Sequence, residues 1–191
     1  NFDGITYAKG ASVLKQLQAY VGYEEFFAGV RKHFDNHAYA NATFADLLGA
    51  LEEASGRDLD AWSAAWLETA GVNTLTPKVE VDADGTITSF SIEQTATEQL
   101  PTLRPHRLAV GFYDVDSATG LLQRTHRHEL DIDGALTEVP ELVGTQRADV
   151  IVLNDDDLTY AKVRLDQRSL STGLEHVAEF SDSLPRSIVL A

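Results

Sequence analysis

The hydrophobic pattern of this chain changes at Leu75–Pro77 from the period of a helix to the period of a strand. Before this point, apolar residues recur three or four positions apart, as they do along one face of an α-helix. After it, apolar and polar residues alternate, as they do in strands that bury one face. The change predicts a helical first part and an antiparallel β-structure after it.

Four helices with short connections are predicted in the first part. We expect them at about 5–21, 24–36, 44–56 and 59–69. Gly22, Gly56 and Gly71 are placed to end helices, because glycine adopts the left-handed conformation at no steric cost. Thr43 and Asp46 have the spacing of a capping box at the start of the third helix. Short helices joined in this way indicate a packed antiparallel bundle or a solenoid-like piece.

The second part predicts a β-sandwich. Seven or eight short strands occupy roughly 90 residues, with turns such as Asp82–Gly85 and Asp116–Gly120 between them, and this is typical of a sandwich. One of these strands is expected at 106–115 and the last at 160–165, and residues 169–181 are helical again. The predicted fold class is therefore α+β with several domains. A helical region lies at 1–75, an antiparallel β-sandwich at 76–166, and the start of a second helical region at 167–191.

Composition narrows the function classes. The 191 residues carry a net charge of −15, which disfavours nucleic acid and anionic membrane surfaces as partners. The absence of cysteine excludes disulfides and thiolate zinc sites and fits a cytoplasmic protein. No apolar run approaches the roughly 20 residues of a transmembrane helix. The chain has no Met, and a helix that starts near Asp182–Pro185 has room for only about two further turns, so we expect a fragment of a longer protein.

Histidines offer three candidate metal motifs. His33 and His37 have the four-residue spacing of the zinc motif HExxH, but no Glu follows His33, and a helix end explains both residues. His128 and Glu129 begin the same motif, but the second histidine is missing and the segment is a predicted strand. His126 and His128 alternate onto one strand face, which could hold a metal. A solvated surface is the favoured interpretation in each case.

Acidic and aromatic clusters have simpler explanations than ligand binding. Asp155–Asp157 and Asp82–Asp84 could indicate calcium, but neither continues into the glycine and glutamate pattern of an EF-hand loop, and turn chemistry accounts for them. Trp62 and Trp66 are four residues apart on a predicted helix and are expected in its core. The sequence contains neither a glycine-rich phosphate loop nor a GxSxG elbow.

The first 17 residues carry the strongest candidate site. Tyr7, Gly10, Leu14 and Leu17 are three or four positions apart, so Tyr7 shares the apolar helix face. Gly10 inside a helix costs about 0.5–1 kcal/mol relative to Ala, which predicts that another backbone or a ligand comes close there. We therefore expect Tyr7 to be partly buried, with a partner for its hydroxyl. The alternative is an ordinary core tyrosine.

The same segment resembles the zinc aminopeptidase family typified by aminopeptidase N. The residues that carry the likeness are Phe2-Asp3-x-x-x-Tyr7-x-Lys9-Gly10-Ala11-Ser12-Val13-Leu14. It continues at Phe26-Phe27, Phe44–Leu47, Trp62–Leu67, Tyr160–Asp166 and Leu184–Arg186. The likeness is specific over residues 1–72, weak over the sandwich and moderate at 158–186.

The resemblance implies an organisation and a chemistry. Residues 1–75 would be the C-terminal helical part of a thermolysin-like catalytic domain, followed by the sandwich and the start of a helical C-terminal domain. The full-length enzyme would remove N-terminal amino acids from peptides with the help of zinc. Tyr7 would donate a hydrogen bond to the oxyanion of the tetrahedral intermediate, and Phe2 would line the pocket for the substrate's first side chain.

The resemblance also limits what the chain can do alone. The sequence lacks HExxH and a recognisable third zinc ligand, so zinc is expected in the full-length enzyme and not in this fragment, which should be inactive. The alternative is a non-catalytic helical plus β-sandwich module that serves as an interaction surface or spacer. A relative that has lost catalysis is a third possibility. An HExxH motif upstream of Asn1 in the reading frame would distinguish these hypotheses.

Overall fold

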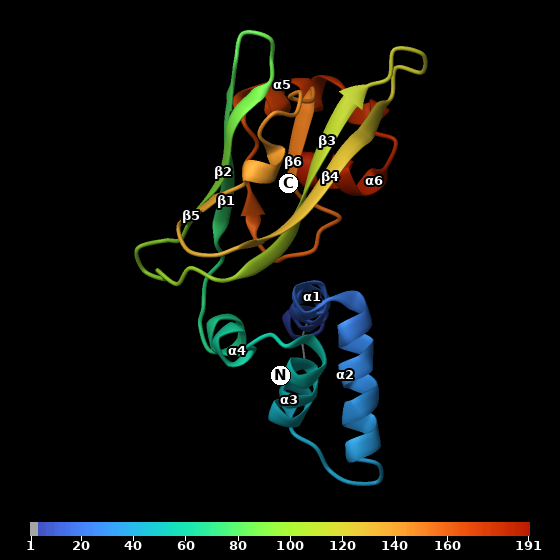
Figure 1. Cartoon of the computed structure of the whole chain (residues 1–191), viewed down its shortest axis with the longest axis vertical. Coiled ribbons are helices and arrows are strands. Elements are labelled where there is room, and N and C mark those ends of the chain that lie inside the picture. Colours follow the sequence, from blue (N-terminus) through green and yellow to red (C-terminus); the bar gives the residue numbers. More distant parts are fainter. Residues whose placement is uncertain (1–3) are drawn as a thin grey trace. The chain divides into compact units, whose positions relative to one another are not determined.

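The computed structural model describes residues 4–191, apart from the side chains at positions 5 and 6 (Figure 1). The chain divides into two compact units, residues 1–70 and residues 71–191. The first unit is helical, and the second contains every strand of the described chain. The change in hydrophobic period therefore coincides with a change in architecture.

The first unit is a bundle of four helices. They are α1 (Gly4–Val21), α2 (Tyr23–Asn36), α3 (Phe44–Ser55) and α4 (Asp60–Leu67). α2 packs along α3 and also contacts α1 (Figure 1). One apolar cluster joins the helices: Val13, Leu17, Val21, Leu48, Leu51, Leu59, Trp62 and Trp66. Both tryptophans are buried in this cluster, which confirms that they are core residues.

Local sequence signals set the ends of these helices. The Thr43 hydroxyl accepts a hydrogen bond from the Asp46 N–H at 3.3 Å, and the Asp46 carboxylate accepts one from the Thr43 N–H at 2.7 Å. This is the predicted capping box. Gly56 ends α3 in the left-handed conformation at φ 69°. The helix boundaries predicted from the sequence are therefore confirmed to within a few residues.

Two sheets form the centre of the second unit. The first has the strand order β5-β2-β1-β7 and the second the order β4-β3-β6. The strands are β1 (Thr74–Val81), β2 (Ile87–Thr95), β3 (His106–Val115), β4 (Leu122–Ile132), β5 (Leu136–Glu138), β6 (Val150–Asp155) and β7 (Lys162–Val163). All paired strands are antiparallel except β1 with β7.

A single apolar cluster contains residues from both sheets, among them Phe90 and Ile92 from β2, Phe112 from β3 and Ile151 from β6. Figure 1 shows the two sheets facing one another. A short 3-10 helix, η1 (Pro140–Leu142), adds Leu142 to this core. The arrangement confirms the predicted α+β fold class with an antiparallel-rich sandwich.

Two C-terminal helices pack against the second sheet. They are α5 (Gln167–Glu175) and α6 (Ser183–Leu190), with the 3-10 helix η2 (Val177–Glu179) between them. Tyr113 and Val152 of the sheet share an apolar cluster with Phe180 and Val189. Residues 71–191 therefore form one compact unit. The assignment of residues 167–191 to a separate helical domain stays a prediction.

Two predicted elements differ from the observed ones. The helix expected at 169–181 ends at Glu175, and the chain continues through η2. The strand expected at 160–165 is reduced to the two residues of β7, which pair parallel with β1. Both segments are amphipathic, so their period was visible, but their ends depend on packing against residues far away in the sequence.

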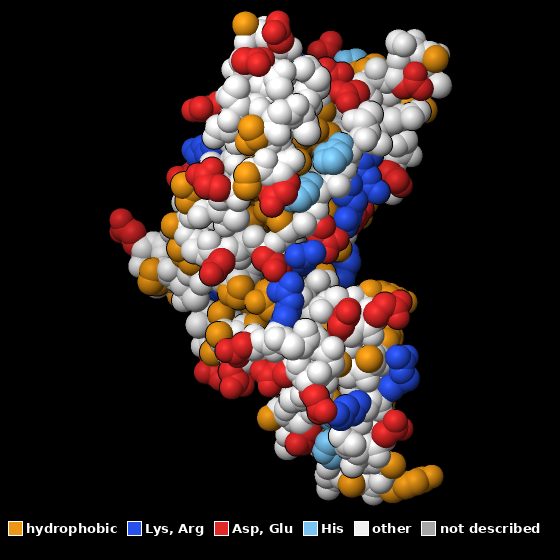
Figure 2. All heavy atoms as spheres, viewed as in Figure 1, with side chains coloured by type: hydrophobic (Ala, Val, Ile, Leu, Met, Phe, Trp, Pro, Cys, Tyr) orange, Lys and Arg blue, Asp and Glu red, His pale blue; other side chains and the backbone are white. Residues whose placement is uncertain are grey.

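The described helices include none that is both long enough and apolar enough to cross a bilayer. Figure 2 shows Asp and Glu side chains spread over the visible face of each unit. The net charge of −15 is therefore not concentrated in one patch on this face.

Candidate functional site

Tyr7 lies in the first turns of α1, and 69% of its surface is exposed. Residues 8–11 are exposed as well, and the apolar cluster of the first unit includes α1 only from Val13 onward. The prediction that Tyr7 is partly buried is therefore wrong for this structure. The helical period correctly placed Tyr7 in line with Leu14 and Leu17, but the core of this unit does not extend along α1 as far as Tyr7.

Gly10 also lies in the open. Among the described residues, a Cβ atom built at this position meets no atom within 4 Å apart from its chain neighbours and its own helix backbone, so the close approach predicted from the glycine is not found there. An apolar groove of about 560 Å³ lies beside it instead. This α1 groove is lined by Lys9, Gly10, Val13, Leu14, Leu17, Phe44, Trp66, Leu67 and Thr69. Leu14, Phe44 and Leu67 remain between 42% and 48% exposed along it.

Phe2 lies outside the described residues. Its proposed contact with a substrate side chain therefore stays a prediction. Of the two candidate site residues, the structure places only Tyr7.

No three His, Asp or Glu side chains of the described residues are grouped so that they could hold a metal ion. His33 and His37 lie at the end of α2 with their rings 4.9 Å apart. The Nδ1 of His37 lies 2.9 Å from the carbonyl oxygen of His33, to which it donates a hydrogen bond. His37 also faces Asp46 at 3.9 Å. These contacts secure the end of a helix, and the described residues do not fit a zinc site.

The second histidine pair lies on β4. His128 is 4.0 Å from Glu141, and His126 packs edge-on against Phe112. Glu129, which follows His128, instead bonds to Arg107 and Arg127 at 2.8 Å each. His128 and Glu129 therefore have different partners, and the fragment of a zinc motif seen in the sequence has no metal-binding counterpart here.

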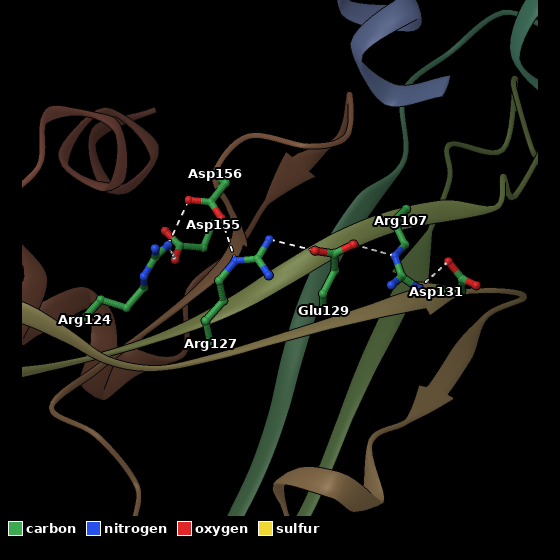
Figure 3. Close-up of polar contacts among 7 residues, drawn as sticks. All are labelled: Arg107, Arg124, Arg127, Glu129, Asp131, Asp155 and Asp156. Carbon is green, nitrogen blue, oxygen red and sulfur yellow. Dashed lines mark hydrogen bonds and ion pairs between the residues drawn. The ribbon is translucent and has the colours of Figure 1, made fainter. Parts of the chain in front are cut away.

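An ion-pair network on the second sheet was not predicted from the sequence (Figure 3). Three arginines alternate in space with four carboxylates, and each arginine contacts two of them. The contacts are Arg107 with Glu129 and Asp131, Arg127 with Glu129 and Asp156, and Arg124 with Asp155 and Asp156, at 2.7–3.1 Å. The alternation of basic and acidic residues along β4 was the one sign of this network in the sequence. The carboxylates at 155–156, which pair with the β4 arginines, lie about 30 residues further along the chain.

Asp155 is the buried member of this network. Its side chain is 1% exposed and accepts hydrogen bonds from the Tyr113 hydroxyl at 2.8 Å and from Arg124 at 2.9 Å. Burial and the Asp155 carboxylate raise the pKa of Tyr113 well above its usual value. Burial alone would raise the pKa of Asp156, but its hydrogen bonds from Arg127 and Arg124 lower it instead. Asp155 and Asp156 are therefore held by arginines, and neither belongs to a group of three or more metal-ligating side chains among the described residues.

A second buried polar cluster surrounds His106, which has no exposed surface. Its Nε2 lies 3.0 Å from the Gln94 side-chain oxygen, and its Nδ1 lies 2.7 Å from the Thr159 hydroxyl. The Gln94 amide nitrogen donates to the Gly134 carbonyl at 2.8 Å, which fixes the Gln94 oxygen as the acceptor for His106. Burial, together with the nearby charge of Arg104, lowers the pKa of His106 to about 3. His106 is therefore a neutral structural residue.

Comparisons with known proteins bear on the whole chain. Residues 1–94 match the profile of the family described as "Peptidase family M1 domain". The chain is 61% identical over its whole length to "Aminopeptidase N" of Streptomyces lividans. It is 29% identical over 93% of its length to "Aminopeptidase M1" of Arabidopsis thaliana. The chain spans 23% and 20% of the lengths of these two relatives.

A solved structure supports the fold. The crystal structure of Legionella pneumophila aminopeptidase A in complex with aspartic acid superposes with a TM-score of 0.64 over 93% of this chain and 20% of that chain. The two sequences are 16% identical, so this likeness concerns the fold alone. The 61% identity, in contrast, extends through both units, and the profile match includes Tyr7. The chain therefore belongs to peptidase family M1, the family of aminopeptidase N.

Proposed function

We propose that this chain is part of an M1 aminopeptidase that removes N-terminal amino acids from peptides. The identity of 61% to aminopeptidase N of Streptomyces lividans carries the proposal. Because the chain spans 23% of that relative, the activity is proposed for the longer protein and not for the chain alone. Nothing in the comparisons favours the alternative of a non-catalytic interaction or spacer module.

We propose that Tyr7 stabilises the transition state in this longer protein. Peptide hydrolysis passes through a tetrahedral intermediate whose oxygen carries negative charge, and a donor aimed at this oxygen lowers the barrier. A phenolic hydroxyl is such a donor at neutral pH. The exposure of Tyr7 on α1 supports the proposal, because a side chain 69% exposed in this unit is accessible to a substrate.

Zinc belongs to the proposal as a cofactor of the longer protein. When bound, it would polarise the peptide carbonyl and activate water. The described residues do not fit such a site. We therefore propose that the zinc ligands lie outside this chain, and that Phe2 contributes to the pocket for the substrate's first side chain.

The role of Tyr7 is tested by Tyr7→Phe in the longer protein, which removes only the hydroxyl. Loss of one oxyanion donor should lower kcat by about 10²–10³. Tyr23→Phe on α2 is the matched control, because Tyr23 is 65% exposed. The assay measures kcat and KM with an aminoacyl anilide, together with thermal unfolding. A loss in kcat no larger than that of Tyr23→Phe would refute the role of Tyr7.

The chain by itself should neither hydrolyse an aminoacyl anilide nor bind zinc at one ion per chain. Isothermal titration with zinc and a long incubation with substrate test both expectations. Tight stoichiometric zinc binding would contradict the assignment of the ligands to other parts of the protein.

A cytoplasmic location stays a prediction from the cysteine-free sequence, which cell fractionation tests. The net charge of −15 disfavours nucleic acid and anionic membrane surfaces, so neither is proposed as a partner.

A further inference from the structure

Strand β7 borders a polar pocket of about 430 Å³ in the second unit. The turn at residues 154–157 and the end of α6 complete its walls. Two cationic side chains, Lys162 and Arg164, line this β7 pocket, and both residues are exposed. Val163 lies between them and packs partly against the core of the sandwich, so the two cations share the opposite face of the strand. The pocket therefore places two positive charges side by side.

The other basic side chains of the second unit are bonded to protein groups. Six of them form ion pairs with carboxylates: Lys78, Arg107, Arg124, Arg127, Arg147 and Arg168. Arg104 and Arg186 donate hydrogen bonds to the Asn73 side chain and to the Phe180 carbonyl. Within the described part of the chain, no ion pair or hydrogen bond holds the charged end of Lys162 or Arg164. Because acidic residues outnumber basic ones in this unit, two neighbouring cations without a carboxylate partner point to an anion from outside the unit.

The backbone around the β7 pocket is fixed, although the two charged ends are not. The Lys162 N–H donates to the Asn73 carbonyl at 2.9 Å, and the Arg164 N–H donates to a β1 carbonyl at 2.8 Å. In the turn that forms another wall, the buried Asn154 side chain donates to the Thr159 carbonyl at 2.8 Å and accepts from the Thr159 N–H at 3.0 Å. The walls of the pocket are therefore set by the fold before a ligand enters.

We infer that the β7 pocket binds a small organic monocarboxylate, with the carboxylate between Lys162 and Arg164. Guanidinium and ammonium groups form strong charge-assisted hydrogen bonds with carboxylates. Four of the eight lining residues are apolar, which suits the hydrocarbon part of such a ligand. A single negative charge fits better than a phosphate dianion, because Asp157 lines the same pocket and the N–H groups of both cationic residues are already used. The inference goes beyond the proposed aminopeptidase activity and does not depend on it.

The test titrates the chain with N-acetyl-leucine and with N-acetyl-leucinamide, which has nearly the same shape but no carboxylate. Backbone amide signals of residues 161–164 in NMR spectra report binding. The acid should shift these signals to saturation, and the amide should leave them in place. Arg164→Gln and Lys162→Gln should each weaken binding of the acid about ten-fold, because each variant removes one charge-assisted hydrogen bond.

Lys78→Gln is the matched control. It removes one cation from the neighbouring strand β1, but this cation is already paired with Glu93 at 3.2 Å, so the affinity for the acid should not change. Thermal unfolding of each variant shows whether it is folded. The inference is overturned if the acid and the amide bind alike, if neither binds, or if Arg164→Gln binds the acid as tightly as Lys78→Gln does.

Two further measurements identify the ligand class and the setting. Inorganic phosphate that binds the pocket more tightly than the acid would overturn the assignment to a monocarboxylate. Calorimetric titration of the longer M1 protein with the acid should give the same affinity as in the chain, and loss of binding there would overturn the inference, because another segment would then fill the pocket. Aminopeptidase activity is measured separately, so its absence would refute the proposed function and leave carboxylate binding as a separate result.

Discussion

Acidification from pH 7 to pH 5 should destabilise the second unit through His106. The folded protein lowers the pKa of this imidazole to about 3, whereas an unfolded histidine titrates near 6.5. The unfolded state therefore binds the proton more readily, and stability falls as the pH drops through 6.5. Linkage gives a loss of about 2 kcal/mol between pH 7 and pH 5. This figure hardly depends on the folded pKa, provided that it lies well below 5.

The structure explains why protonation of the His106 ring is unfavourable in the folded protein. His106 has no exposed surface, its Nε2–H is already used by Gln94, and Arg104 places a positive charge nearby. Carboxylates with lowered pKa values, such as Glu129 and Asp156, also lose stabilisation on acidification. Their contribution is lost only as the pH falls below their unfolded values near 4. The interval from pH 6.5 to pH 5 therefore excludes the carboxylates, and a variant without His106 separates this residue from the other five histidines.

The assay is urea denaturation of the chain at pH 7, 6 and 5. Unfolding is monitored through a spectroscopic signal that arises from the second unit. His106→Gln is the control, because glutamine can still hydrogen-bond but does not titrate. This variant should be less stable at pH 7 and should lose about 2 kcal/mol less than the wild type on acidification. An NMR titration of the His106 ring provides an independent check and should show no protonation between pH 8 and pH 5. Equal losses in both proteins, or a ring that titrates near 6.5, would refute the reasoning.

Two further substitutions test the packing and the capping. Gly111→Ala should destabilise the chain by about 1–3 kcal/mol, because the new Cβ would overlap the Asp155 carboxylate and lie 2.9 Å from the Tyr113 ring; a denaturation midpoint equal to that of the wild type would contradict this. Thr43→Ala should cost about 1 kcal/mol through loss of the α3 cap, which thermal unfolding of the chain measures, and Thr43→Ser should restore most of it.

Features that depend on neighbouring residues were predictable from the sequence. The capping box of Thr43 and Asp46 spans three residues, and Gly56 ends α3 one residue after its last turn. The turn at Asp82 is held by hydrogen bonds from the backbone N–H groups of Asp84 and Thr86 to its own carboxylate. Each signal is complete within a few positions, so the pattern of residue types was enough to locate it.

Features that join distant segments were not predictable. His106 depends on Gln94 and Thr159, which are 12 and 53 residues away, and in the sequence it was only the first residue of a strand. The same holds for Asp155, whose partners Tyr113 and Arg124 become neighbours only when β3, β4 and β6 pair. The sequence alone does not reveal the register in which the three strands pair. These clusters could therefore be found only in the folded chain.

Tyr7 and Gly10 show a third situation, in which the pattern was right about the helix face and wrong about its surroundings. Periodicity identifies which residues share a face, but it does not say which part of a protein covers that face. The structure leaves Tyr7 exposed and places an apolar groove next to Gly10. Among the described residues, Gly10 has no close neighbour that the missing side chain would relieve, so the helix-forming cost of a glycine does not by itself locate a contact.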